Sequence, residues 1–154
     1  RKFIETDEFD EIIKLAIINH NRDNIEDGLT ERQLLHAKLI RDADKIDILY
    51  ESIDIYYKNN EEEVNKSVLS EKIYNEFTKK ATIKNYKNIE TSGDILVAHF
   101  AYIYDLYFKP TLRIFKDKRY IDQLYNRFNF TNKDTAEKFK VIHEKAKQYI
   151  EEKG

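Results

Sequence analysis

The chain has 154 residues, which suits one domain with one core, and it carries a net charge of −2 from acidic and basic residues mixed along its length. This charge pattern excludes the basic stripe of a nucleic-acid-binding protein, the lack of a long apolar run excludes a membrane span, and the lack of cysteine excludes disulfides and thiol catalysis. Three glycines and one proline are too few for the turns of a β-sandwich or barrel, so we expect an all-α protein, and without a secretory signal we expect it in the cytoplasm.

The N-terminal part of the chain predicts a short helix and a turn. The helix covers residues 9–19, where apolar residues recur at helical spacing, and Thr6 or Asp7 is its expected cap. The turn covers residues 21–28, which are mostly polar and end in a glycine.

A long helix follows, from Thr30 to about residue 59. Thr30 and Gln33 have the spacing of a capping box, in which each side chain accepts a hydrogen bond from a free backbone N–H of the first turn. Apolar residues line this helix on two opposite sides, so we expect it to be the buried central helix of the domain. One apolar stripe comprises Leu35, Leu39, Ile46, Leu49 and Ile53, and the other comprises Ile40, Ile48 and Ile55.

The rest of the chain predicts further helices within the same domain. In chain order we expect a polar linker (59–66), a helix (68–80), a connection (81–90), an apolar helix (91–108), two short helices (111–116 and 119–128) and a final helix (134–152). The pair Lys109-Pro110 should end the apolar helix, and Asp134 should cap the final one. We therefore expect one all-helical domain over 1–154, with a motif-bearing part at 1–58 and a C-terminal helical part at 59–154.

One segment of the long helix is rich in chemistry: Arg41-Asp42-Ala43-Asp44-Lys45-Ile46-Asp47. Asp44 lies four residues after Ile40 and four before Ile48, so its carboxylate falls within an apolar stripe and needs a cation. That cation is either Arg41 or Lys45 of the same helix, in a structural ion pair, or a divalent metal ion.

The neighbours of Asp44 extend this interpretation. Arg41 and Lys45 lie four residues apart, so one phosphate or carboxylate can bridge them. Asp42 falls within the other apolar stripe, and Asp47 follows Asp44 closely enough to support the same site. The simpler alternative is a charge network within the helix that fits it among its neighbours.

The chain has four histidines, which are the residues most often used as metal ligands. His20 ends the first helix, where its side chain can turn towards a cleft, but His20 and Asp44 alone are too few ligands for a metal. His99 stands in the apolar helix and is expected to be a hydrogen-bonded core residue. His36 and His143 lie on charged, exposed helix faces, and we assign them no role.

Two stretches resemble HD-domain phosphohydrolases. Residues 12–21 contain Ala16-Ile17 and His20-Asn21 in the pattern of that family's AI-x-x-HN segment, and residues 37–48 are similar to its RDADKLDIL segment. Residues 94–108 resemble a third family segment more loosely. The resemblance thus covers most of the chain, with its specific motifs in the first third.

This resemblance implies an all-α fold, one or two divalent metal ions (Mn, Mg, Fe or Zn) and hydrolysis of a small phosphate ester or nucleotide by a metal-bound water. It puts Asp44 at the last ligand of the metal site and His20 at a histidine that serves a second metal or the substrate phosphate. Asp44 and Lys45 are then the candidate catalytic residues, and Arg41 and Asp47 the candidate residues around the bound group.

The chain departs from the family in one respect, because none of its histidines is followed by aspartate. In the family, a first histidine and a His-Asp pair precede the segment that matches residues 1–21. Methionine is also absent, even at position 1, so we expect either a part of a longer protein or a sequence from which modified methionines are missing.

Three functions follow from these patterns. The first is the C-terminal part of a metal-dependent phosphohydrolase, inactive alone, whose uncovered apolar face favours a homo-oligomer. The second is a non-catalytic helical module that senses a nucleotide or binds a protein. The third is a helical scaffold with an ion-paired Asp44. None of the three involves nucleic acid or a membrane.

Overall fold

Capping hydrogen bonds determine where two of the main helices begin. At the start of α2 (Glu31–Asp54), the Thr30 hydroxyl accepts a hydrogen bond from the backbone N–H of Gln33, and the Gln33 side chain accepts one from the backbone N–H of Thr30. Thr91 and Asp94 form the same reciprocal pair at the start of α5 (Ser92–Ala101). Both helix starts agree with the sequence prediction.

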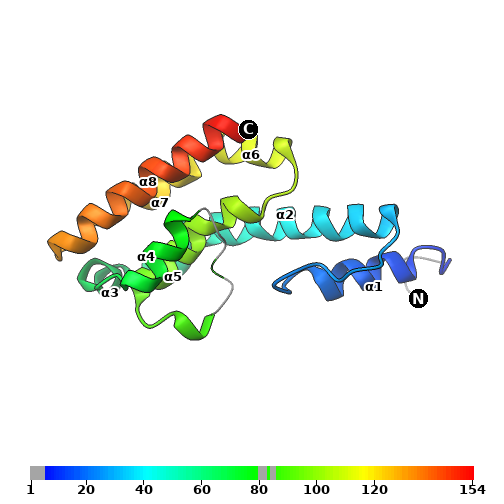
Figure 1. Cartoon of the computed structure of the whole chain (residues 1–154), viewed down its shortest axis with the longest axis horizontal. Coiled ribbons are helices and arrows are strands. Elements are labelled where there is room, and N and C mark those ends of the chain that lie inside the picture. The colour runs from blue at the N-terminus through cyan, green and yellow to red at the C-terminus, as the bar shows by residue number, and fades with distance from the viewer. Residues whose placement is uncertain (1–5, 80–82, 84–85) are drawn as a thin grey trace.

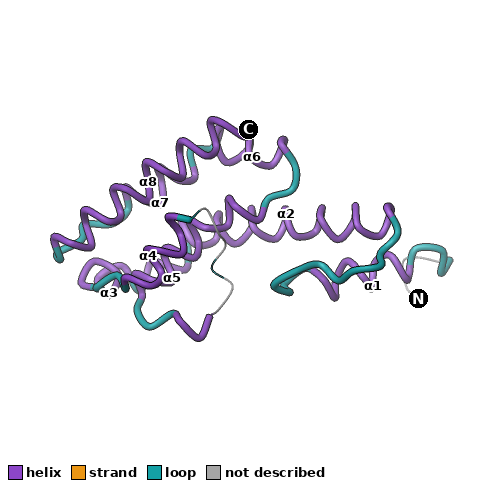
Figure 2. Tube along the Cα trace, in the orientation of Figure 1, coloured by secondary structure: helices purple, strands orange, loops and turns teal. Residues whose placement is uncertain are grey.

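The computed structural model describes residues 6–79, 83 and 86–154, and the regular elements in this part of the chain are all helical (Figures 1 and 2). They form one all-α domain, as the composition predicted. None of the described helices is long and apolar enough to cross a membrane. The elements are α1 (Asp10–Asn19), α2, η1 (Tyr56–Lys58), α3 (Glu61–Lys66), α4 (Glu71–Thr78), η2 (Tyr86–Asn88), α5, η3 (Tyr102–Asp105), α6 (Lys109–Asp117), α7 (Tyr120–Asn126) and α8 (Lys133–Lys153), where η denotes a 3₁₀ helix.

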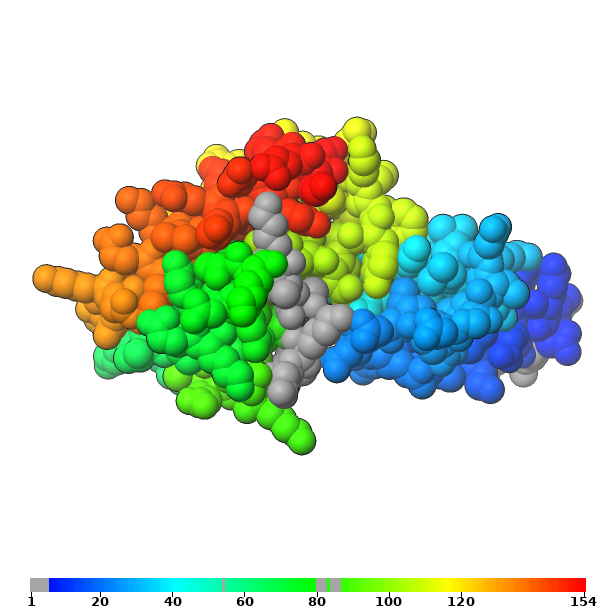
Figure 3. Space-filling model, in the orientation of Figure 1, coloured from blue at the N-terminus to red at the C-terminus, as the bar shows by residue number. Residues whose placement is uncertain are grey.

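Helix α2 runs through the molecule and joins two parts of it (Figure 1). We call α1, residues 20–30 and the N-terminal half of α2 the arm, and the C-terminal half of α2 with α3 to α8 the body. The C-terminal half of α2 lies in the body, where Leu49 and Ile53 join a core built with side chains from α3 to α8. Its N-terminal half lies beside α1 in the arm, which projects from the body in Figure 3. The two arm helices run in the same direction (Figure 1). Their starts lie together, since Arg32 in the first turn of α2 lies over the ring of Phe9, which precedes α1. Residues 20–30 return along the pair.

The prediction that α2 is buried along its whole length is therefore wrong for the arm. Leu49 is 0% exposed and Ile53 is 8% exposed, but Leu35, Leu39 and Ile40 are 40–46% exposed. Within the described residues, this half of the helix is contacted by α1, by the returning segment and, near its end, by residues 105–108, and these neighbours leave one of its faces uncovered.

Several helices begin or end at residues other than the predicted ones. Helix α2 ends at Asp54 rather than near residue 59, and the predicted linker over 59–66 contains helix α3. Helix α4 begins only at Glu71, after the Ser70 hydroxyl accepts the backbone N–H of Ile73. Helix α4 ends at Thr78, and the predicted connection over 81–90 contains η2, whereas residues 80–82 and 84–85 lie outside the described residues.

The predicted ends around proline and the predicted caps of the outer helices also change. Pro110 stands in the first turn of α6 rather than ending the preceding helix, because the first turn of a helix has no use for the missing N–H. Asn132, not Asp134, caps α8 by accepting the backbone N–H of Thr135 at 2.9 Å. Helix α1 follows Phe9 and has no side-chain cap.

Two histidines belong to the packing of the body. His143 was expected to be exposed, but it is half-buried: its Nε2 lies 2.7 Å from Asp122 Oδ1 and its ring stacks on Tyr125. His99 is buried in the core, as expected, with Nδ1 2.8 Å from the Tyr57 hydroxyl. Burial lowers the pKa of His99 to about 4, so its ring is neutral at pH 7.

Acid should destabilise the fold through His99. The unfolded chain binds a proton at this residue below its ordinary pKa of 6.5, whereas the folded chain resists protonation down to about pH 4, so stability falls as the pH drops through this window. Between pH 7 and pH 5 we expect this term to cost about 2 kcal/mol, measured by urea unfolding. The variant His99→Gln should lose less stability than the wild type over that interval. The exposed His36→Gln is the control, and an acid loss that is unchanged in His99→Gln would contradict the assignment.

Candidate functional site

Two cations of α2 bind one carboxylate of η3. Arg41 Nη2 lies 2.6 Å and Lys45 Nζ 2.8 Å from the same oxygen, Asp105 Oδ2. Both basic side chains are less than 10% exposed. The prediction that one of them pairs with Asp44 is wrong. Arg41 and Lys45 share the face of α2 that turns towards η3, where Asp105 meets both of them.

Arg41 also holds the segment that follows α1. Its Nη1 donates hydrogen bonds to the backbone carbonyls of Asn19 at 2.9 Å and Arg22 at 2.6 Å. The buried Asn19 side chain closes the same segment, because its Oδ1 accepts the backbone N–H of Glu26. Arg41 thus joins the end of α1, helix α2 and η3, and its Nη atoms are engaged within the chain.

Asp42 supplies a helix cap from a distance. Its carboxylate is buried and accepts the backbone N–H groups of Tyr107 at 2.9 Å and Phe108 at 3.1 Å. These residues precede α6, whose own N-cap residue, Phe108, has no side chain able to accept a hydrogen bond. Asp42 therefore fixes the backbone between η3 and the start of α6.

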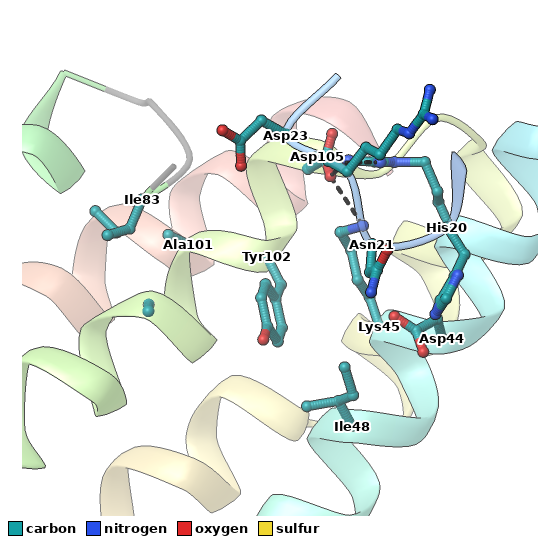
Figure 4. Close-up of a pocket in the computed structure, with 13 residues that line it drawn as sticks. His20, Asn21, Asp23, Asp44, Lys45, Ile48, Ile83, Ala101, Tyr102 and Asp105 are labelled. Atoms are coloured by element: carbon teal, nitrogen blue, oxygen red, sulfur yellow. Dashed lines mark hydrogen bonds and ion pairs between the residues drawn. The ribbon is translucent and has the colours of Figure 1, made fainter. Parts of the chain in front are cut away.

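A pocket of about 130 Å³ lies between this cluster and η3 (Figure 4). It is lined by the segment after α1, by α2, by the end of α5, by η3 and by Ile83. Asp44 and His20 lie towards the same side of it in Figure 4, with Tyr102 and Ile48 further along the wall. The lining residues are His20, Asn21, Arg22, Asp23, Arg41, Asp44, Lys45, Ile48, Ile83, Ala98, Ala101, Tyr102 and Asp105.

Asp44 and His20 both keep free acceptor atoms in this pocket, and they lie towards the same side of it. Asp44 is half-buried, and its carboxylate has no hydrogen bond or ion pair with any other residue that the structure describes. His20 Nδ1 lies 2.6 Å from the carbonyl oxygen of Ile17, and because a carbonyl only accepts, Nδ1 carries the proton. The Nε2 lone pair of His20 is then available to a ligand.

The charges of the pocket balance. Three basic side chains (Arg22, Arg41 and Lys45) face three carboxylates (Asp23, Asp44 and Asp105). Asp105 is already neutralised by two of the cations, whereas Asp44 is not, so the side of the pocket near Asp44 favours a positively charged group. Figure 4 shows Asp23 on the opposite side of the pocket from Asp44.

The predicted metal ligands do not form a complete site. Among the described residues, no three side chains of the His, Cys, Asp and Glu types converge on one point. His20 and Asp44 are two donors of a suitable kind, and a protein metal site usually needs three or more. The residues present are thus insufficient for the implied metal.

The structure brings together four of the five residues predicted for the site. Arg41, Asp44, Lys45 and His20 line the pocket, whereas Asp47 is exposed and lies outside it. The prediction missed Asp105, which holds the two cations. The available signal was a single carboxylate in a run of aromatic residues, which needs a basic partner when it is partly buried.

Comparisons with known proteins add no identification, because no family model, no curated protein and no solved structure matches this chain.

The buried Asp42 should contribute more to stability than the exposed Glu51 of the same helix. Asp42→Asn replaces one acceptor oxygen by an amide that cannot accept the N–H of Tyr107 or Phe108, so we expect a loss of about 2 kcal/mol in the free energy of unfolding. Glu51→Gln, the matched control, should change it by less than about 0.5 kcal/mol. Urea unfolding of both variants measures the difference, and equal effects would contradict the capping role.

Proposed function

We propose that this chain provides part of the phosphate-ester site of an HD-type, metal-dependent phosphohydrolase, and that it does not turn over substrate by itself. The observation that carries the proposal is that His20 and Asp44, far apart in sequence, line one small pocket beside Lys45. These are the residues to which the motif resemblance assigns the site. A space of about 130 Å³ suits a phosphoryl group.

The residues of this chain would act by position and charge. Asp105 holds Lys45 at the wall of the pocket, and Arg41 holds the segment that carries His20 against α2. His20 keeps Nε2 free because Nδ1 is engaged with the Ile17 carbonyl. Asp44 supplies a negative charge on the same side of the pocket as His20, and this carboxylate has no cation partner among the described residues.

The incomplete donor set supports the inactivity of the chain alone. Two donors do not hold a divalent ion firmly, so the described residues are too few for a metal-dependent step. The same observation favours a second candidate, a non-catalytic module that binds a nucleotide or phosphate. This candidate needs the pocket but no metal.

A titration followed by NMR separates the two candidates. We expect Mn²⁺ or Mg²⁺ to perturb resonances around His20 and Asp44 weakly and inorganic phosphate to perturb the pocket more strongly in the presence of the metal. Asp44→Asn should abolish the metal effect, and Asp117→Asn, an exposed carboxylate on α6, should leave it unchanged. A phosphate effect that needs no metal and survives in Asp44→Asn would favour the binding module.

The inactivity is tested directly with p-nitrophenyl phosphate and nucleoside triphosphates in the presence of Mn²⁺ or Mg²⁺. We expect no turnover above the blank. Turnover by this polypeptide that disappears in Asp44→Ala would contradict the inactivity and would show that the described donors suffice.

A further inference from the structure

An apolar groove lies along the arm, on a different face of α2 from the pocket. Its volume is about 750 Å³, and α1 forms one wall while the N-terminal half of α2 forms the other. The side chains along it are among the most exposed large apolar residues of the chain. Phe9, Ile13, Ile17, Leu39 and Ile40 are 37%, 41%, 57%, 46% and 40% exposed.

This groove is unlike the rest of the molecule. In the body, α2 is covered by other helices, and Leu49 is fully buried. In the arm, two helices and a returning segment form a single layer. No second layer of described residues covers the apolar side chains that α1 and α2 present on one side of it. Continuous apolar surfaces of this kind in soluble proteins mark contact sites.

The charges along α2 point to the occupant. Arg32, His36, Ile40, Ala43 and Asp47 follow one another at steps of three or four residues, so they share one face of the helix. This face is basic at its start, apolar in its middle and acidic at its end. Neither Arg32 nor Asp47 has an ion-pair partner among the residues that the structure describes.

We propose that this face pairs with the same face of a second copy of the chain, with the two α2 helices antiparallel. Positions 32 and 47 are equally far from the midpoint between Leu39 and Ile40. A two-fold axis at this midpoint places Arg32 of each copy opposite Asp47 of the other, and every contact occurs twice.

The second copy also covers the apolar side chains of the groove. Around the axis, Leu39 of one copy meets Ile40 of the other, and the small side chain of Ala43 lets the helices approach closely. Helix α1 of each copy lies beside this pair, so the four arm helices form an antiparallel bundle with an apolar interior. The pocket of His20 and Asp44 stays outside the interface, so this inference does not depend on the proposed function.

Sedimentation equilibrium of the full chain tests the apolar contact. We expect a dimer, and Ile17→Asp, which puts a charge into the groove at a residue that is already 57% exposed, should weaken dimerisation at least about tenfold. Val68→Asp is the matched control, because Val68 is 55% exposed but lies before α4 in the body, and it should leave the dimer intact. Circular dichroism checks that both variants are folded.

A charge swap tests the antiparallel arrangement. Arg32→Asp and Asp47→Arg should each weaken the dimer, because each puts like charges opposite one another twice, and the double variant should restore it. A wild-type chain that is monomeric at all concentrations would overturn the proposal and leave the groove to a different protein. A dimer that Ile17→Asp does not weaken, or that the double variant does not restore, would overturn the proposed interface.

Discussion

The ion pairs of Arg41 and Lys45 with Asp105 join α2 to η3, and Arg41 also joins both to the segment after α1. Burying two cations costs free energy unless a carboxylate and further hydrogen bonds compensate for the lost water. Here Asp105 Oδ2 serves both cations, and two backbone carbonyls complete the environment of the Arg41 Nη1. Removing Asp105 would leave two buried charges unpaired, and η3 and the segment after α1 would lose their common anchor.

The same interaction determines what is left in the pocket. Because Asp105 takes both Arg41 and Lys45, Asp44 keeps a carboxylate without a cation. The neighbouring Asp42 needs no cation, since two backbone N–H groups donate hydrogen bonds to its carboxylate. Three acidic residues within one short region thus have three fates: Asp42 caps a helix, Asp44 faces the pocket, and Asp47 lies exposed on the outer surface.

Helix α2 combines three surroundings along its length. Its C-terminal half is a core element of the body, one side near its middle lines the pocket, and its N-terminal half presents an apolar face with α1. The pocket and the groove lie on different faces of the helix, so a ligand in one and a partner in the other do not compete. Both depend on the Arg41 contacts that keep the segment after α1 against the helix.

Features that depend on neighbours within about four residues were predictable from the amino-acid sequence alone. The scarcity of glycine and proline predicted an all-α chain, and Thr30 with Gln33 predicted the start of α2, because both capping partners lie within one turn. The periodicity of Leu49 and Ile53 predicted a buried face in the C-terminal half of the helix.

The partner of each charged or apolar side chain, in contrast, depends on how distant segments pack together. Asp105 lies 64 residues from Arg41, and Asp42 caps a helix 65 residues away, and no local spacing encodes either contact. The same is true of burial: Leu39 and Leu49 belong to one periodic pattern, but only Leu49 has helices packed over it. Helical periodicity determines which face a side chain occupies, whereas the arrangement of distant segments determines whether that face is covered.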